Sequence, residues 1–564
     1  MKKHYLKVTA ALLAALTIGF TSCDDDDDPN EVDKQNPSLV SVSINNDNTE
    51  ATVYFSEGVY KMDDATGDLD EESIDVSVSG GSLTLESFTV SHTAGNNSAI
   101  INLTMSDTDS DGSELLTISV EEGSSYDADG NAIDAGSVNV NFNEFAGAII
   151  PEEVALTSYA ENGTLPSDYE SVLLDHFNDN NNIATSELEI DAENIVPAAG
   201  EASDGVAPSD GWFDDVTYQG AFEPGGNNWA EGWNLAFGFD GTSTATNEVV
   251  ITDDITSDVT WTKDNIYVLD GFISVTSSAT LTIEPGTMIQ GKSGQGENAS
   301  ALIVRKDGKI DAEGTASEPI VFTGYGDEYD GSGYSTGVRG LWGGLILLGE
   351  APTNNSIEKR IEGVPEEEDA FYGGDDADHN SGVVKYVTIR HGGTDIGAGN
   401  EINGFTLGGV GSGSTLEYVA VISNVDDGVE FFGGNPNLKH CVVAYCGDDS
   451  YDYDEGFSGK GQFWVAIQSD ETGDRLGEHD GGTGSDEEAT PYALPTIYNA
   501  TYIGNGGKTI MFRDNAGGVY ANSIFANTST GITVEYRDDK NSSYDQLLDG
   551  NLVLKNNIFV NVGF

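Results

Sequence analysis

The sequence predicts an all-β protein in which a β-sandwich precedes a right-handed parallel β-helix solenoid. Between residues 37 and 143, short runs alternate apolar and polar side chains and are separated by Gly, Asn and Asp, as in a sandwich. From about residue 265, strand-forming runs recur every 22–24 residues, as in the coils of a β-helix. Gly makes up 70 of 564 residues, about 12% against a usual ~7%, which suits a turn-dense β architecture.

The chain is strongly acidic. It contains 97 Asp and Glu against 23 Lys and Arg, which gives a formal net charge of −74. Nucleic-acid binding depends on Lys and Arg that neutralise phosphates, so this balance excludes a nucleic-acid partner. It also disfavours electrostatic docking on an anionic membrane. Hydrophobic residues make up 38% of the chain, which is enough for a large core.

Residues 1–22 have the features of a lipoprotein signal peptide. Lys2 and Lys3 precede an apolar run, Val8–Phe20, that is too short to span a bilayer. The Phe-Thr-Ser-Cys sequence that ends at Cys23 resembles a bacterial lipobox, which implies that Cys23 is lipidated and becomes the mature N-terminus. The alternative is an ordinary signal peptide followed by an incidental cysteine.

An acidic tether follows over residues 23–36. Its five consecutive aspartates, Asp24–Asp28, resemble the surface-export signal of Bacteroidetes lipoproteins, and the alternative is a solvated spacer. Together, the signal, the lipidated cysteine and the tether predict a protein that is lipid-anchored in the outer membrane and faces the extracellular side.

The predicted sandwich occupies residues 37–143. Val53–Glu57 and Tyr126–Asn131 resemble motifs of the bacterial Ig-like module of S-layer and surface proteins, which implies a spacer or an adhesive unit. Asp107–Gly112 matches the first half of an EF-hand calcium loop, but the twelfth position would be Ile118 instead of Glu. We therefore favour a polar hairpin loop over a calcium site there.

Residues 144–264 are less regular, and we predict a linker and an N-terminal cap for the solenoid. A solenoid needs a cap over its first coil. Trp212, Trp229 and Trp233 fall within 22 positions. They could stack on a sugar, but we favour a role in capping the end of the core.

The predicted solenoid occupies residues 265–564. Leu416–Asn424 is followed by the equivalent run Leu438–Cys446 after 22 residues, and Gly428–Phe432 by Ser450–Asp454 after the same step. Parallel coils of this length would stack about 4.8 Å apart with their aliphatic side chains inside. Helical repeats are excluded because the 3.6-residue apolar spacing is absent. Leucine-rich repeats are excluded because their fixed Leu/Asn signature is also absent.

Two further features of this region lead to expectations. Cys441 and Cys446 would face opposite sides of one extended strand, so we favour two packed thiols over a disulfide. The apolar run Asn557–Val562 lacks an evident cap, so either the sequence is a fragment or something else covers the last coil.

Several strings in residues 150–564 resemble a broad family of pectin-lyase-like, outer-membrane β-helix lipoproteins of Bacteroidetes, marine proteobacteria and spirochaetes. The resemblance implies a fold and a location, and it carries over no catalytic residue. The strings are Arg360–Gly363, Tyr372–Asp376, Ser381–Gly393, Asp426–Gly434 and Asp448–Gly456.

The 22-residue step places acidic residues in stacks. Carboxylates about 5 Å apart repel by a few kcal/mol at an effective dielectric constant of ~20. Bound Ca²⁺, raised pKa values or basic neighbours such as Lys439, Lys460 and Arg475 would offset this repulsion. The alternative, that the aspartates are solvated turn residues, stays open. The candidate calcium ligands are Asp426, Asp427, Glu430, Asp448, Asp449, Asp452 and Asp454.

The same residues allow a carbohydrate-active enzyme, either a polysaccharide lyase or a glycoside hydrolase, as an alternative. Arg513 and Arg537 recur at coil spacing beside Asp514 and Asp538, which favours a structural Arg–Asp ladder over catalysis. Fold analogy alone does not establish catalysis. The other candidate bases are Lys460, His440 and His391.

We therefore predict a surface-exposed outer-membrane lipoprotein with a non-catalytic binding, adhesion or nutrient-capture role and a calcium-stabilised β-helix. Its candidate partners are the outer membrane, through the lipid anchor, a carbohydrate ligand and a TonB-dependent receptor.

Overall fold

The computed structural model divides the chain into two compact units, Met1–Glu144 and Phe145–Phe564. Among the residues that it describes, no helix is long and apolar enough to cross a membrane. The described residues are 36–44, 50–80, 84–106, 115–128, 130–141, 155–162, 164–186, 188–294, 298–355, 359–365, 368–395, 401–469, 472–482 and 486–563.

The first unit consists of two antiparallel sheets around a common core. Its strands pair in the orders β1-β2-β5-β4 and β3-β6-β7. Both sheets contribute to the core, with Val53 and Ile101 from one sheet and Leu116 and Ile118 from the other. The likeness to an Ig-like module stays a prediction. The strands are β1 (Leu39–Ile44), β2 (Glu50–Phe55), β3 (Asp75–Ser79), β4 (Leu85–Ser91), β5 (Ser98–Met105), β6 (Leu115–Val120) and β7 (Gly136–Asn141).

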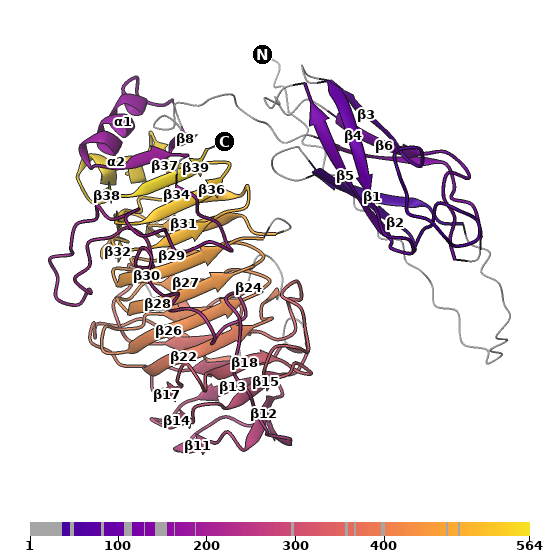
Figure 1. Cartoon of the computed structure of the whole chain (residues 1–564). Coiled ribbons are helices and arrows are strands. Elements are labelled where there is room, and N and C mark those ends of the chain that lie inside the picture. The colour runs from indigo at the N-terminus through magenta and orange to yellow at the C-terminus, as the bar shows by residue number, and fades with distance from the viewer. Residues whose placement is uncertain are drawn as a thin grey trace, which may run out of the picture. The chain divides into compact units, whose positions relative to one another are not determined.

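The second unit is a parallel β-helix, as predicted, and Figure 1 shows its strands stacked along one axis. One face, which we name sheet A, is formed by ten parallel strands of the described chain. The strands of sheet A, in spatial order, are β13 (Phe272–Val275), β16 (Ala301–Val304), β19 (Leu345–Leu348), β25 (Phe405–Gly408), β27 (Val429–Phe432), β29 (Tyr451–Asp454), β31 (Arg475–Asp480), β34 (Lys508–Arg513), β37 (Ile532–Arg537) and β8 (Leu156–Asn162).

The remaining faces belong to a second sheet, which we name sheet B. Most of its strands are short and form two parallel ladders. The longer strands β22, β26, β28 and β30 each belong to both ladders and so join them into one sheet. Its strands are β10 (Asn247–Ile251), β11 (Val259–Trp261), β12 (Asn265–Leu269), β14 (Thr280–Ile283), β15 (Met288–Gly291), β17 (Lys309–Glu313), β18 (Ile320–Gly324), β22 (Gly382–Arg390), β26 (Thr415–Ile422), β28 (Asn437–Ala444), β30 (Lys460–Ile467), β32 (Thr496–Tyr498), β33 (Thr501–Ile503), β35 (Gly518–Ala521), β36 (Ile524–Thr528), β38 (Leu552–Lys555), β39 (Ile558–Val562) and β9 (Ile183–Thr185).

The remaining elements lie outside these two sheets. Two small antiparallel pairs, β20 (Lys359–Arg360) with β21 (Phe371–Tyr372) and β23 (Thr394–Asp395) with β24 (Glu401–Ile402), belong to connections between coils. The helices of the described chain are α1 (Tyr169–Asp179) and α2 (Ser543–Leu548).

The long strands of sheet B bend where one residue per coil adopts a left-handed backbone. Tyr386, Tyr418, His440 and Phe463 have φ values of 47°, 53°, 58° and 60°. This conformation is costly for side chains of this size. In-register stacking compensates, because successive ring centroids lie 4.3, 4.3 and 4.8 Å apart. The coil corner is therefore an aromatic stack held by the register.

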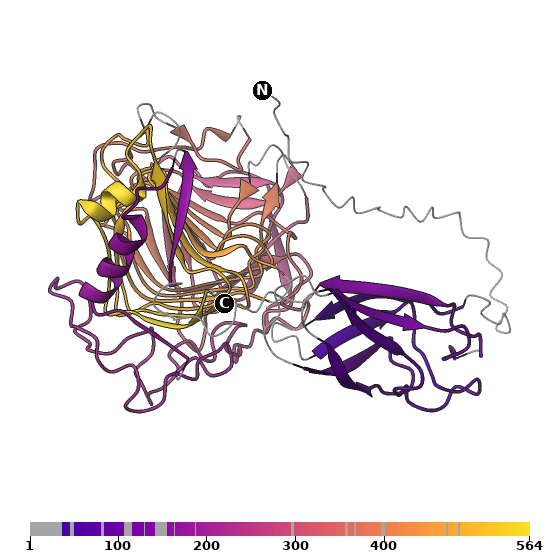
Figure 2. The same cartoon turned by 90° about the horizontal axis from the view of Figure 1, so that it is seen from above.

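The last coils are covered by residues from the beginning of the second unit, which differs from the predicted N-terminal cap. β8 pairs with β37 and β9 pairs with β39, and α1 lies between β8 and β9 in the chain. The Asn182 side chain donates to the Leu554 carbonyl oxygen at 2.8 Å. Figures 1 and 2 show α1 and α2 together at this end. Residues 155–162 and 164–186 thus cap the far end, and β10 begins the solenoid before residue 265.

The chain between β9 and β10 runs along the outside of sheet B instead of covering an end. Trp233 is fully buried and packs with Ala420 and Val442 of sheet B. The Trp229 ring meets the His440 ring edge-on at 4.9 Å, and Lys439 Nζ lies 4.6 Å from the Trp212 ring centroid. The three tryptophans are therefore used in packing, but along the side of sheet B and not at the end of the core, where we expected them.

Cys441 and Cys446 are free, buried thiols, as expected. They do not face opposite sides, however, because both belong to the interior core of the solenoid. The strand β28 ends at Ala444, and Tyr445, with φ of 60°, turns the chain before Cys446. The bend thus returns the second thiol to the inside.

We expect Phe177→Ala to lower the free energy of unfolding by about 3–5 kcal/mol, the usual cost of truncating a buried phenylalanine. Phe177 is buried in α1 and its ring lies 5.5 Å from that of Phe559 in β39. Urea unfolding followed by circular dichroism measures the effect. The exposed Glu170→Gln on the same helix is the control, and equal stability of both variants would contradict the cap.

Candidate metal centre

The predicted acidic stacks lie on the outer face of sheet A and on the turns that lead into it. In β27, Val429 and Phe431 point into the core, so Glu430 points outward. The same alternation directs Asp452 and Asp454 of β29 outward. One face of the solenoid therefore carries a carboxylate on successive coils.

The register places these carboxylates on neighbouring coils, as predicted. Glu430 pairs with Asp452, and Asp452 pairs with Glu478 on the next coil. In the preceding turn, the backbone N–H of Asp449 donates to Asp427 Oδ1 at 2.8 Å. The 22-residue period therefore predicts correctly which residues are neighbours on adjacent coils.

Three groups of carboxylates are close enough to share a cation, since the candidate oxygens within each group lie within 4.8 Å of one another. The first two groups share Asp427. The three groups together contain six of the seven predicted ligands. The seventh, Asp454, belongs to none of them, and its Oδ1 accepts the Glu455 N–H at 2.5 Å. The groups are Asp426, Asp427 and Asp448; Asp427, Glu430 and Asp452; and Asp448, Asp449 and Asp474.

Burial and mutual repulsion favour the protonated forms of these side chains. Asp427 and Glu430 are each only 7% exposed. Burial, followed by the charge of Asp449, raises the pKa of Asp427 well above its usual range. Burial and the charge of Glu362 do the same to the pKa of Glu430, and burial with the charge of Asp480 raises that of Asp452. A cation would remove this penalty.

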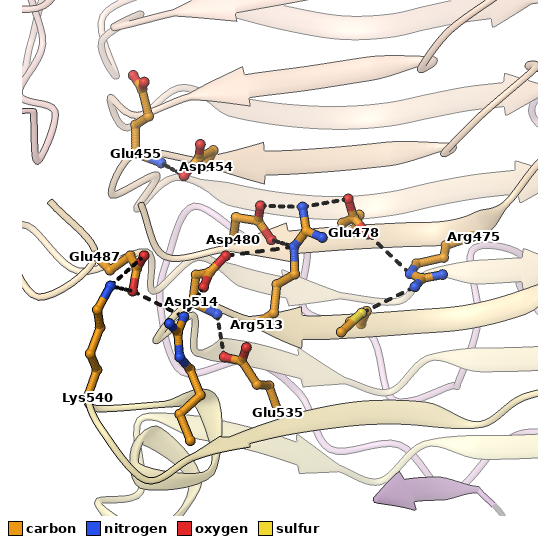
Figure 3. A network of polar contacts seen from close by, with 12 residues as sticks. Asp454, Glu455, Arg475, Glu478, Asp480, Glu487, Arg513, Asp514, Glu535 and Lys540 are labelled. Carbon is orange, nitrogen blue, oxygen red and sulfur yellow. Dashed lines mark hydrogen bonds and ion pairs between the residues drawn. The ribbon is translucent and has the colours of Figure 1, made fainter. Parts of the chain in front are cut away.

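Basic side chains pair with carboxylates around β31, where Figure 3 shows Arg475 and Arg513 beside Glu478 and Asp480. Arg475 pairs with Asp474 at 2.8 Å and with Glu478 at 3.2 Å. Lys508 pairs with Asp474 at 2.5 Å. The third group, which contains Asp474, therefore already has counter-ions. The two groups around Asp427 are the better candidates for a cation.

Two of the three basic neighbours expected from the sequence lie elsewhere. Lys439 and Lys460 belong to sheet B, where they pair with Asp214 at 3.0 Å and Asp210 at 2.6 Å. Their partners come from the segment between β9 and β10, which the repeat pattern does not place. Of the three, only Arg475 reaches the acidic face.

Arg513 and Arg537 form the expected structural ladder. Each pairs with an aspartate of the preceding coil instead of the aspartate that follows it in sequence. Arg513 Nε donates to Asp480 Oδ1 at 2.6 Å (Figure 3), and Arg537 donates to Asp514 Oδ1 at 2.5 Å. The sequence neighbour Asp514 is 3.9 Å from Arg513 Nε. Each arginine therefore connects its own coil to the preceding one.

The two candidate histidines lie in β28 of sheet B (His440) and directly after β22 (His391), and both are packed there. His440 is stacked between Tyr418 and Phe463, and burial lowers its pKa to about 4. His391 is buried, with Nδ1 2.7 Å from the Val338 carbonyl oxygen. Neither is brought to the acidic face.

One residue missed by the sequence reasoning is Asn403. It is 1% exposed, and its amide nitrogen donates to Glu430. Its Oδ1 and the Oδ1 of Asp452 have no hydrogen-bond partner among the described residues. Asn403 precedes Asp427 by 24 residues, one repeat step, so extending the period upstream could have found it.

The residues around Asp427 fit a hard cation such as Ca²⁺. It takes six to eight oxygen ligands from carboxylates, amides and backbone carbonyls. The two groups supply four more carboxylates beside the shared Asp427, and Asn403 adds an amide oxygen with no other partner in the described chain. The loop Asp107–Gly112, the other calcium candidate, lies outside the described residues, as does Cys23.

Comparisons with known proteins address the fold of this unit. Residues 253–564 match the family model of the pectate-lyase-like β-helix domain. Among solved structures, a pectin methylesterase from Aspergillus niger is 12% identical and has a TM-score of 0.21, and the match covers 51% of this chain and 77% of that one. No curated protein matches the chain.

We expect Asp427→Asn to be more stable than the wild type in EDTA at pH 8 and no more stable at pH 4. The folded-state pKa of Asp427 is raised above the unfolded value of about 3.9. Above that pH, the folded chain therefore binds more protons at this residue than the unfolded chain does. The contribution of Asp427 to stability is therefore lost as the pH rises above about 4. Thermal melts across this range measure the difference. The exposed Asp311→Asn on β17 is the control, and an equal effect of both variants would be contrary evidence.

Proposed function

The chain belongs to the pectate-lyase-like β-helix family, and from this premise we propose that it is a non-catalytic binding protein whose outer face holds Ca²⁺. The observation that carries the proposal is the pair of carboxylate groups that share the buried Asp427. Without a cation, the fold must bear the repulsion of these groups at short range. A bound Ca²⁺ supplies positive charge and could leave open coordination positions for a ligand.

Calcium suits this site better than the smaller Mg²⁺. Mg²⁺ prefers a nearly ideal octahedron with several retained waters, whereas Ca²⁺ accepts irregular sets of oxygens. The groups around Asp427 come from different turns and strands, which supports an irregular ligand set.

A binding role is supported by the state of the candidate bases. Lys460 is paired with Asp210, and Arg513 is paired with Asp480 through both Nε and Nη2. An arginine in such a pair keeps its proton, so it is a poor general base. We therefore place the carbohydrate-active enzyme second.

We expect Ca²⁺ to raise the melting temperature of the wild type and EDTA to reverse the change. At a free concentration of about 100 times the dissociation constant, the stabilisation would be about 2.7 kcal/mol. The double variant Asp427→Asn/Glu430→Gln should lose most of the effect because it removes two candidate ligands. Differential scanning calorimetry and isothermal titration calorimetry measure it, with Asp311→Asn as the matched control.

Two results would count against this proposal. The absence of any Ca²⁺-dependent shift in the wild type would favour the interpretation of the aspartates as turn residues. Polysaccharide turnover by the wild type that Lys460→Ala or Arg513→Ala abolishes would favour the enzyme.

We further propose that the protein is attached to the outer membrane through a lipid on Cys23 and faces the extracellular side. The lipobox-like sequence and the aspartates that follow it support this location. The first unit would act as an Ig-like spacer or adhesive unit, and the solenoid would present the acidic face to a carbohydrate ligand or a TonB-dependent receptor.

We expect Cys23→Ser to move the protein from the outer-membrane fraction to the soluble fraction, because the variant cannot accept the lipid. Fractionation with metabolic labelling by a fatty-acid analogue measures this, with Cys441→Ser as the control. Retention of unlabelled Cys23→Ser in the membrane would be evidence against the anchor.

A further inference from the structure

The short segment 359–365 lies directly on the turn before β25, where Asn403 is located. A Cβ atom at Gly363 would lie 2.2 Å from the carbonyl oxygen of Glu401 and 2.6 Å from Ile402 Cγ1. Only glycine permits this approach, and its φ of 65° is also one that glycine tolerates best. Ile361 and Val364 are buried in one cluster with Ile402. Glu362 is therefore fixed between two anchored neighbours.

The turn beneath this segment faces the acidic groups. Ile402 occupies the repeat position of Asp426, and Asn403 that of Asp427, because Phe405 pairs with Val429. Asn403 donates to Glu430, and its buried Oδ1 has no partner in the described chain. An oxygen ligand without a partner thus lies beside the cluster, independently of the carboxylates themselves.

A second attachment holds the same stretch of chain to β29. Glu455 follows Asp454 and is 3% exposed. Its carboxylate accepts hydrogen bonds from Lys359 Nζ at 2.6 Å, Asn355 Nδ2 at 2.5 Å and the Tyr372 hydroxyl. These donors flank Glu362 on both sides in sequence, so Glu455 ties both ends of the stretch to the acidic coil.

We propose that Glu362 is a further ligand of the cation site, closing it on its outer side, and that Glu455 is the positioning residue that holds Glu362 there. This inference rests on the proposed function. It is supported by the close approach of Gly363 to Glu401 and Ile402, and by the buried Oδ1 of Asn403 on the same turn, which has no partner in the described chain. A cation between Glu362 and the neighbouring carboxylates would offset their repulsion.

Tb³⁺ luminescence and Ca²⁺ calorimetry on the full chain test the inference. Glu362→Gln should weaken Ca²⁺ binding by about 10- to 100-fold, the usual scale for losing a group around a metal. The luminescence lifetimes of bound Tb³⁺ in H₂O and D₂O should report at least one additional coordinated water. The variant should fold normally in EDTA, because it removes a repelling charge.

The exposed Glu350→Gln, at the end of β19, is the matched control. If Glu362→Gln and Glu350→Gln had the same Ca²⁺ affinity and the same number of coordinated waters, the role of Glu362 would be overturned. A wild type that binds neither ion would instead overturn the proposed function itself, so the two failures are distinguishable.

The positioning role of Glu455 has a separate test. Glu455→Gln should also weaken binding and add coordinated water. The double variant Glu362→Gln/Glu455→Gln should bind no more weakly than Glu362→Gln alone, because Glu455 acts through Glu362. Additive losses would show that Glu455 acts independently and would overturn this part of the proposal.

Discussion

The in-register pairing of parallel coils is the constraint on which the other features of the solenoid depend. Each residue has the residue of the next coil as its neighbour, one strand spacing or about 4.8 Å away. For apolar and aromatic side chains this repetition is favourable, and the stack from Tyr386 to Phe463 stabilises a bend that each residue alone would resist. For carboxylates the same repetition is unfavourable, and Glu430, Asp452 and Glu478 are held together by the backbone ladder and not by mutual attraction.

A single column of sheet A shows how the fold sustains this repulsion. The column has uncharged residues on both sides of the three acidic ones. In order, its outward positions are Ile303, Ile346, Thr406, Glu430, Asp452, Glu478 and Met511. At one end, the cluster of Ile303 and Ile346 is covered by the chain around Ile361. At the other end, Arg475 contacts both Glu478 and Met511. The repulsion is therefore confined to a few coils inside a well-packed framework, which can hold a preorganised cation site.

The parts of this arrangement that follow from the repeat could be predicted from the sequence. The 22-residue step gives the correct neighbours for Asp427 and Glu430, because register is set by local spacing. The step says nothing about segments outside the repeat. Lys439 and Lys460 lie in sheet B, where they pair with Asp214 and Asp210 of a segment outside the repeat. The connection that contains Gly363 packs on Glu401 in the same unpredicted way. Such contacts depend on long-range packing, which propensity and period do not encode.

The covering of the last coils changes the energetics expected of a solenoid. In a simple repeat protein, each coil contacts only its neighbours and the coils can open independently. Here β8 pairs with β37, the chain then follows sheet B through Trp233, and β10 begins the first coil. The described residues between 155 and 251 thus contact the last coils, the side of sheet B and the first coil. Trp233 packs on Ala420 of β26 and Val442 of β28, and these strands belong to the coils that continue into β27 and β29 with Glu430 and Asp452. Separating these coils would therefore also disrupt the packing of Trp233, so this long-range contact helps to hold the like charges one strand spacing apart.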